Sequence, residues 1–272
     1  MLWANGVACA VLLVGYLAPV VDPRKIWIIA FFGLAYPPVL LVNLLLIAYW
    51  LIRKSKWAFL SLACILIGWK VLNNNIGFRL PSTQLAHADS NVLRMMNYNV
   101  HGFRKFGAEW NVFTRHDIAG IIKHEHPSVL TVEEFFSRRN SRFDMVDSLK
   151  DAMGAVYCYF QPFPASHTGG VGMAIFSVYP IVNTGMVLLE GQQGLNQCIY
   201  ADVKKNGRLI RIYAVHLKSI SFEPEDYRYL DSLSKKGKAN MQSSRRIGAK
   251  LKHAFLVRSG QVERVKRHMA QC

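Results

Sequence analysis

Three long apolar segments near the N-terminus most constrain what this chain can fold into. They run from Leu2 to Val21, from Ile26 to Leu51 and from Trp57 to about Leu72. A helix needs about 20 apolar residues to cross a bilayer, whereas strands in globular domains are usually about 3 to 10 residues long. We therefore predict an N-terminal anchor of three transmembrane helices over residues 1–78, with the lipid bilayer as its partner.

A cleaved signal peptide is the alternative for the first segment. Apolar residues follow Met1 directly, without the basic region that opens a signal peptide, and two more apolar segments come after it. The second segment contains Pro37 and Pro38, where we expect a kink that neighbouring helices can accommodate. Both observations favour three retained helices over a removed leader.

The loops between the segments predict an orientation. The loop "DPRK" balances Arg24 and Lys25 against Asp22, whereas "RKSK" at residues 53–56 has three cations and no acid. Positively charged loops tend to remain cytoplasmic. We therefore expect a multi-pass protein of a bacterial inner membrane, with the residues after about 78 on the outer, periplasmic side.

After a polar linker at residues 79–90, the remaining chain reads as an α/β domain over residues 91–272. A strand at 92–100, a helix in "TRHDIAGIIKHEH" and a continuous apolar strand in "PSVLTVEEFF" follow one another. Another buried strand is expected in "GGVGMAIFSVYPIV". Two β-rich runs joined at Asn206-Gly207 predict a hairpin, and the chain from Tyr227 onward is expected to be mostly helical.

Polar side chains follow three of these apolar strands. In "NVLRMMNYNVHGF", Asn97, Asn99 and His101 alternate with apolar residues at the end of the strand. Glu134 ends the apolar run "VLTVEEFF", and His216 ends "IYAVH". Each residue alone is more often solvated or part of a turn than a ligand. Together, an amide, a carboxylate and an imidazole suit a hard cation such as Mg²⁺ and a phosphate group.

The order of four motifs resembles the endonuclease/exonuclease/phosphatase superfamily of metal-dependent phosphoesterases. The motifs are "MMNYNVHG", "PSVLTVEEF", "GVGMAIFSVYPIV" and "IYAVHLKS". Together with three preceding spans they are similar to membrane-anchored bacterial members. The resemblance covers about residue 91 to the end. It implies a deoxyribonuclease I-like α/β sandwich of two sheets and hydrolysis of phosphodiester or phosphomonoester bonds with Mg²⁺ or Mn²⁺.

The resemblance also implies site residues. Asn99 matches the first-strand Asn beside the metal, Glu134 matches the Glu that ligates it, and His216 matches the active-site His after the central hairpin. The chain departs from the family pattern at Ser128, where Asp is usual, and at Glu133, where Gln is usual. Either Glu133 or Glu134 could hold the metal, and alternation along the strand favours Glu134. The roles of Asn97 and His101 remain open.

Two later motifs of the resembling enzymes do not occur in the sequence. These are a "GDFN"-like Asp and Asn pair and an "SDH"-like Asp and His pair, which complete the metal site and the general base. We therefore expect a C-terminally truncated member with little phosphoesterase activity of its own. The alternative is a non-catalytic, membrane-anchored binding or scaffold protein. A nucleic acid and a phospholipid head group both remain open as substrates, and no protein partner can be inferred.

Charge and cysteines constrain the function less. The net charge of +16 is concentrated between Lys235 and Arg267, where Glu263 is the only acid. A solvated helix is the simplest reading, and attraction to nucleic acid or to anionic lipid is the alternative. The five cysteines show no metal or redox spacing. Cys158 and Cys198 could form a disulfide, but two free buried thiols are expected.

Overall fold

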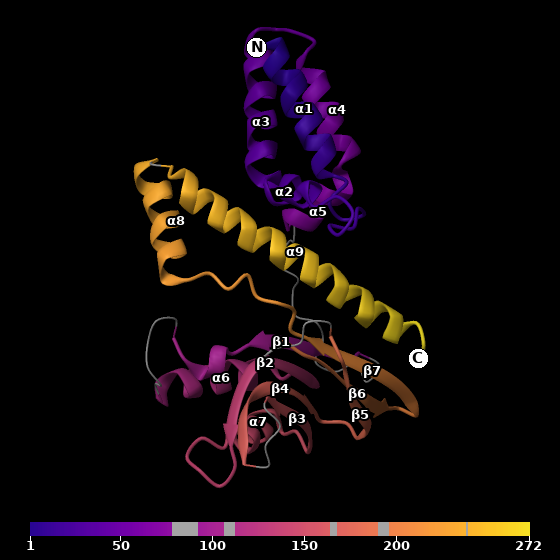
Figure 1. The fold of residues 1–272 in the computed structure, drawn as a ribbon. Coiled ribbons are helices and arrows are strands. Elements are labelled where there is room, and N and C mark those ends of the chain that lie inside the picture. The colour runs from indigo at the N-terminus through magenta and orange to yellow at the C-terminus, as the bar shows by residue number, and fades with distance from the viewer. Residues whose placement is uncertain (78–91, 106–111, 164–167, 190–195, 238) are drawn as a thin grey trace. The chain divides into compact units, whose positions relative to one another are not determined.

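The computed structural model describes residues 1–77, 92–105, 112–163, 168–189, 196–237 and 239–272 (Figure 1). The predicted linker, residues 79–90, lies outside these ranges. The chain divides into two compact units. One comprises Met1–His87 with Ile220–Ser259, and the other comprises Ala88–Ser219 with Gly260–Cys272.

The N-terminal apolar segments form five helices, so the prediction of three continuous helices is wrong. Among the described residues, no single helix combines the length and apolarity needed to cross a bilayer, while α2 and α3 meet that requirement together across a 60° bend. The five helices are α1 (Leu2–Gly15), α2 (Ile28–Leu34), α3 (Tyr36–Ile52), α4 (Ala58–Ile67) and α5 (Trp69–Asn75).

Two structural features accompany the breaks between these helices. Pro37 and Pro38 occupy the first turn of α3, where their missing N–H groups cost nothing, so a new helix begins there. Between α4 and α5, the Tyr16 ring fills the space next to Gly68 that a Cβ atom would need. The Tyr16 hydroxyl also donates a hydrogen bond to the carbonyl of Cys64 at 2.9 Å. The bend before α3 is the kink that the prolines predict, whereas the break at Gly68 involves Tyr16, which the apolar pattern does not indicate.

The helices of this bundle bury a few polar side chains beside an apolar core that includes Leu12 and Leu40. Asn5, Asn43 and Ser61 are fully buried, and the Ser61 hydroxyl donates to the Asn5 amide oxygen at 2.6 Å. The Asn43 amide donates to the carbonyl of Ala8 at 3.2 Å. In contrast, large apolar side chains are exposed along α1, α3 and α4. They include Trp3, Leu45, Ile52, Phe59 and Ile67.

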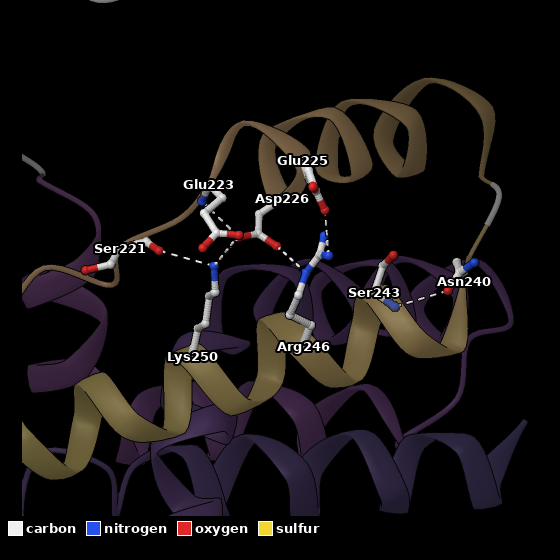
Figure 2. Close-up of polar contacts among 8 residues, drawn as sticks. All are labelled: Ser221, Glu223, Glu225, Asp226, Asn240, Ser243, Arg246 and Lys250. Carbon is white, nitrogen blue, oxygen red and sulfur yellow. Dashed lines mark hydrogen bonds and ion pairs between the residues drawn. The ribbon is translucent and has the colours of Figure 1, made fainter.

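Helices α8 (Pro224–Lys236) and α9 (Met241–Met269) form a hairpin that is joined by charged groups (Figure 2). The fully buried Asp226 accepts hydrogen bonds from Arg246 Nε at 2.8 Å and from Lys250 Nζ at 2.7 Å. Its carboxylate also accepts the backbone N–H of Glu223, which closes a capping box at the start of α8. One carboxylate therefore both caps α8 and ties it to α9.

We expect Asp226→Asn to destabilise this hairpin at neutral pH. Hydrogen bonds to the Asp226 carboxylate lower its pKa from 3.8 to about 2. The largest effect comes from the Lys250 ammonium, and the Glu223 backbone N–H and Arg246 add to it. A lowered pKa in the folded state means that the stabilisation is present above about pH 4 and is lost as the pH falls toward 2. Hydrogen exchange of the α8 amides should accelerate in Asp226→Asn. In Asp231→Asn, which removes an exposed carboxylate paired only with Lys235 on the same helix, exchange should stay near wild type.

The second unit is mixed α/β with two sheets, as the sequence predicts. One sheet has the order β1-β2-β4-β3 and the other the order β5-β6-β7. The strands are β1 (Met95–Asn99), β2 (Val129–Arg138), β3 (Tyr157–Phe163), β4 (Gly169–Ser177), β5 (Ile181–Val187), β6 (Cys198–Lys205) and β7 (Arg208–Val215). Helices α6 (Val112–Glu125) and α7 (Met145–Met153) and a short 3₁₀ turn at His101–Phe103 complete the unit before α9.

Two apolar layers hold this unit together. On one face of the first sheet, β2 and β4 pack against α6 and α7, and the layer includes Ile122, Leu130, Val132, Phe135 and Leu149. On the other face the two sheets pack on each other, through residues that include Val129, Ile175, Ile199, Ala201 and Ile212. Strand β2 is therefore buried on both faces, as its continuous apolar sequence predicts.

Several sequence predictions are confirmed. Strands β1 and β2 are parallel with α6 between them, and β6 and β7 pair as a hairpin around Asn206-Gly207. Cys158 and Cys198 are free, and burial raises the pKa of each thiol to about 12. Strands β3 and β5 and helix α7 are not among the predicted elements, and the single strand expected in "GGVGMAIFSVYPIV" ends at Ser177 before β5 begins at Ile181.

Candidate metal and phosphate site

A β-bulge in β2 positions the two adjacent carboxylates. The pairing of β2 with β4 shifts register between Val132 and Phe135, and Glu134 has a left-handed backbone with φ of 50°. Strict alternation would place Glu134 on the same face as Leu130 and Val132, in the helix-covered core. The extra residue instead turns Glu134 away, so that Phe135 occupies the next core position.

The bulge brings Glu134 to the end of β1. Asn99 Nδ2 donates to Glu134 Oε1 at 3.1 Å, and Nδ1 of His101 lies 3.0 Å from Glu134 Oε2. The turn after β1 holds this arrangement, because the backbone N–H of His101 donates to Asn99 Oδ1 at 3.0 Å. His101 is itself left-handed, with φ of 47°. Such backbone conformations are costly for residues other than glycine, and they often cluster at functional sites.

The second sheet contributes His216, which follows the last residue of β7. Its Nε2 lies 3.6 Å from Glu134 Oε1, and its backbone N–H donates to the carbonyl of Gln197 at 2.8 Å. The structure therefore brings together the three residues that the sequence predicts, Asn99, Glu134 and His216. The structure also places His101 at this site, although the sequence leaves the role of His101 open. The alternation of Asn97, Asn99 and His101 along the chain is the sequence feature that could have identified it.

The neighbouring Glu133 has a different environment. It is 5% exposed, and burial raises the pKa of its carboxyl group above the usual value, although His216 and Asn97 act in the opposite direction. Asn97 also accepts a hydrogen bond from the Thr131 hydroxyl. Glu134, by comparison, has a side chain that is 22% exposed and can meet a ligand from solvent. The geometry therefore favours Glu134 as the ligand and Glu133 as a buried neighbour.

We expect Glu133→Gln to stabilise the protein at neutral pH. Because the pKa is raised in the folded state, the folded protein resists ionisation of Glu133, and the penalty grows as the pH rises above the unfolded value near 4.5. Removing the charge should raise the midpoint of thermal unfolding at pH 7. The gain should vanish near pH 4. An equal gain at both pH values would contradict this explanation.

The residues present fit a hard divalent cation. Glu134 and Asn99 supply carboxylate and amide oxygens, and Mg²⁺ commonly takes one or two protein carboxylates and completes its shell with water. A flip of the Asn99 amide would place its oxygen where Nδ2 now faces Glu134 Oε1, at the cost of the hydrogen bond from the His101 N–H. In the part of the chain that the structure describes, no group of three or more His, Cys, Asp or Glu side chains is arranged to hold a metal ion. A cation here would therefore rest on few protein ligands.

Comparisons with known proteins match different parts of the chain. Residues 1–75 match a family described as "Domain of unknown function (DUF8431)". A comparison with curated proteins gives no significant match.

Solved structures resemble part of the chain. An endonuclease/exonuclease/phosphatase from Beutenbergia cavernae matches with 22% identity and a TM-score of 0.39, over 48% of this chain and 39% of that one. Humanized D. rerio TDP2 matches with 13% identity and a TM-score of 0.37, over 57% and 66% of the two chains. An endonuclease/exonuclease/phosphatase family protein from Leptotrichia buccalis matches with 14% identity and a TM-score of 0.35, over 58% and 73%. The chain thus spans less than two thirds of the first two structures.

Proposed function

We propose that this protein is a membrane-anchored, Mg²⁺- or Mn²⁺-dependent phosphoesterase of the endonuclease/exonuclease/phosphatase kind. The observation that carries the proposal is the convergence of Asn99, His101, Glu134 and His216 from both sheets of the α/β unit. The left-handed bulge that directs Glu134 to them supports a built site, since a regular strand would bury this residue.

Each residue has a distinct role in the proposed chemistry. Glu134 holds the cation, and the Asn99 amide binds the cation or a phosphate oxygen. A bound Mg²⁺ would neutralise phosphoryl charge and so favour in-line attack by water. His216 donates a hydrogen bond or a proton to the phosphoryl group or the leaving oxygen. His101 orients the Glu134 carboxylate through its 3.0 Å contact, so it is a positioning residue.

Turnover by this chain should be slow. The Asp and His pair that acts as general base in the resembling enzymes has no match in its sequence, and members of a catalytic unit do not act additively. The substrate is a phosphate ester, either of nucleic acid or of a phospholipid head group. A non-catalytic binding protein with the same fold is the second candidate, and the lack of a match to that Asp and His pair favours it.

Hydrolysis of bis-p-nitrophenyl phosphate by the full chain in detergent tests the proposal. We expect a slow, Mn²⁺-dependent rate that is abolished by EDTA and reduced by about 10²-fold or more in His216→Ala, in line with loss of a general acid or base. His253→Ala, on the exposed surface of α9, is the control. Metal binding without any hydrolysis would support the binding protein. Absence of both would reject the proposed site, and a rate typical of complete enzymes would reject slow turnover.

We also propose that residues 1–78 anchor the protein in a bacterial inner membrane with the α/β unit on the periplasmic side. The exposed apolar side chains of the five-helix bundle and the hydrogen-bonded amides and hydroxyl buried in it support lipid contact, because such groups commonly join helices within a bilayer. The cations of "RKSK" support a cytoplasmic second loop. Alkaline phosphatase fused after Gly77 should be active. Activity only of a cytoplasmic reporter at that position would reverse the orientation.

A further inference from the structure

A cavity lies in the α/β unit, and its lining residues do not include the four residues of the candidate site. It has a volume of about 390 Å³, within the range of small-molecule pockets. The end of β2, helix α7, strand β3 and the start of β4 form its walls. The lining residues are Ser137, Arg139, Val146, Lys150, Cys158, Tyr159, Phe160, Pro162 and Gly169.

The charge of this cavity is positive. Arg139 follows β2 and Lys150 lies on α7, and neither side chain forms an ion pair within the described part of the chain. None of the described lining residues is acidic. The carboxylates of α7 and its N-cap are Asp144, Asp147 and Asp151, and none of them lines the cavity. Asp144 is engaged by the Ser137 hydroxyl at 3.4 Å and by the backbone N–H of Asn140 at 3.2 Å.

The other lining groups are apolar or already bonded. Val146, Phe160 and Pro162 supply an apolar surface. The Ser137 oxygen accepts the backbone N–H groups of Met145 and Val146 at 3.0 and 3.2 Å, which fixes the start of α7 against β2. Burial raises the pKa of the Cys158 thiol to about 12, so it adds no negative charge at neutral pH. The lining of the cavity therefore combines two cations with an apolar surface.

We propose that this cavity binds a small organic anion, a phosphate or phosphonate joined to a planar apolar group. Arg139 and Lys150 hold the anion, because guanidinium and ammonium donors form short, charge-assisted hydrogen bonds with phosphate oxygens. Phe160, Val146 and Pro162 contact the apolar group. The proposal does not depend on hydrolysis at the Glu134 site, since the two sets of residues share no member.

Calorimetry with three probes and the full chain in detergent tests this site. Phenylphosphonate carries both the anion and the ring and cannot be hydrolysed as a phosphate ester. Methylphosphonate lacks the ring, and benzyl alcohol lacks the anion. We expect saturable binding of phenylphosphonate, with each of the other two at least about tenfold weaker. All titrations include EDTA, so that metal-dependent binding near Glu134 does not contribute.

Matched variants locate the binding. Arg139→Gln and Lys150→Gln should each weaken phenylphosphonate binding by about tenfold, and the double variant should abolish it. Arg138→Gln, which removes an adjacent exposed cation that does not line the cavity, should leave the affinity within about twofold. Circular dichroism checks that each variant is folded. Absence of saturable binding, or equal affinity in the double variant and wild type, would overturn the proposal. Equal affinities for phenylphosphonate and methylphosphonate would overturn the apolar half of it.

Discussion

Glu134→Ala is expected to weaken Mn²⁺ binding by about a hundredfold or more. Loss of even an outer-sphere partner commonly costs about 10- to 100-fold in metal affinity, and Glu134 is the proposed anionic ligand itself. Asn99 and His216 would remain, but an amide and an imidazole carry no negative charge to hold a hard cation. Isothermal titration calorimetry on the full chain measures the difference directly.

Glu133→Ala is the matched control for that measurement. Glu133 is adjacent in sequence and equal in charge, but it is buried beside Asn97 and does not take part in the Glu134 contacts with Asn99 and His101. We expect its replacement to change Mn²⁺ affinity by less than about fivefold, which is the effect of losing one nearby charge. Equal losses in the two variants would mean that the carboxylates act as a pair. Unchanged affinity in Glu134→Ala would remove the site.

Phe135→Ala is expected to lower the free energy of unfolding of the α/β unit by about 3–5 kcal/mol, because it opens a cavity in the core. Phe135 is fully buried, and its ring makes edge contacts with Phe103, Phe160 and Phe176 at centroid separations of 5.7, 5.1 and 5.6 Å. Those partners come from the turn after β1, from β3 and from β4. One substitution therefore loosens contacts across the whole first sheet.

Chemical denaturation with Phe113→Ala as the control checks this prediction. Phe113 lies on α6 and is 74% exposed, so its loss should change the free energy of unfolding by less than about 0.5 kcal/mol. A loss of under about 1 kcal/mol in Phe135→Ala would show that the neighbouring rings close the cavity.

The order of the elements in the α/β unit could be predicted from local patterns. The apolar run from Val129 to Val132 predicts a buried strand, and the dipeptide Asn206-Gly207 predicts a hairpin turn. Both predictions depend only on residues that are close together in the sequence. Asn99, Glu134 and His216 lie close together, but Glu134 lies within β2 and not at its end as the sequence analysis expected. Their proximity depends on the pairing of β1 with β2 and on the second sheet, which local patterns do not report.

What the sequence did not predict depends on contacts between distant residues. The bulge at Glu134 is one case. Alternation along β2 predicts that Glu134 shares a face with Leu130 and Val132, and the register shift against β4 shows that it does not. The break at Gly68 is another, because it arises from Tyr16, far away in the chain. Helix α7 is short, and its first turn is fixed by the hydroxyl of Ser137 on β2. Such features are set by tertiary packing, which local periodicity does not report.

The bulge in β2 also separates two kinds of evolutionary change. Leu130, Val132 and Phe135 face the helices, while the inserted residue turns Glu134 toward Asn99 and His101 at the end of β1. Substitutions that adjust packing against α6 and α7 therefore fall on different positions from those that alter ligand chemistry. Deleting a single residue at 133 would restore regular pairing and merge the two sets, so insertions and deletions here should be far less tolerated in descendants of this chain than substitutions.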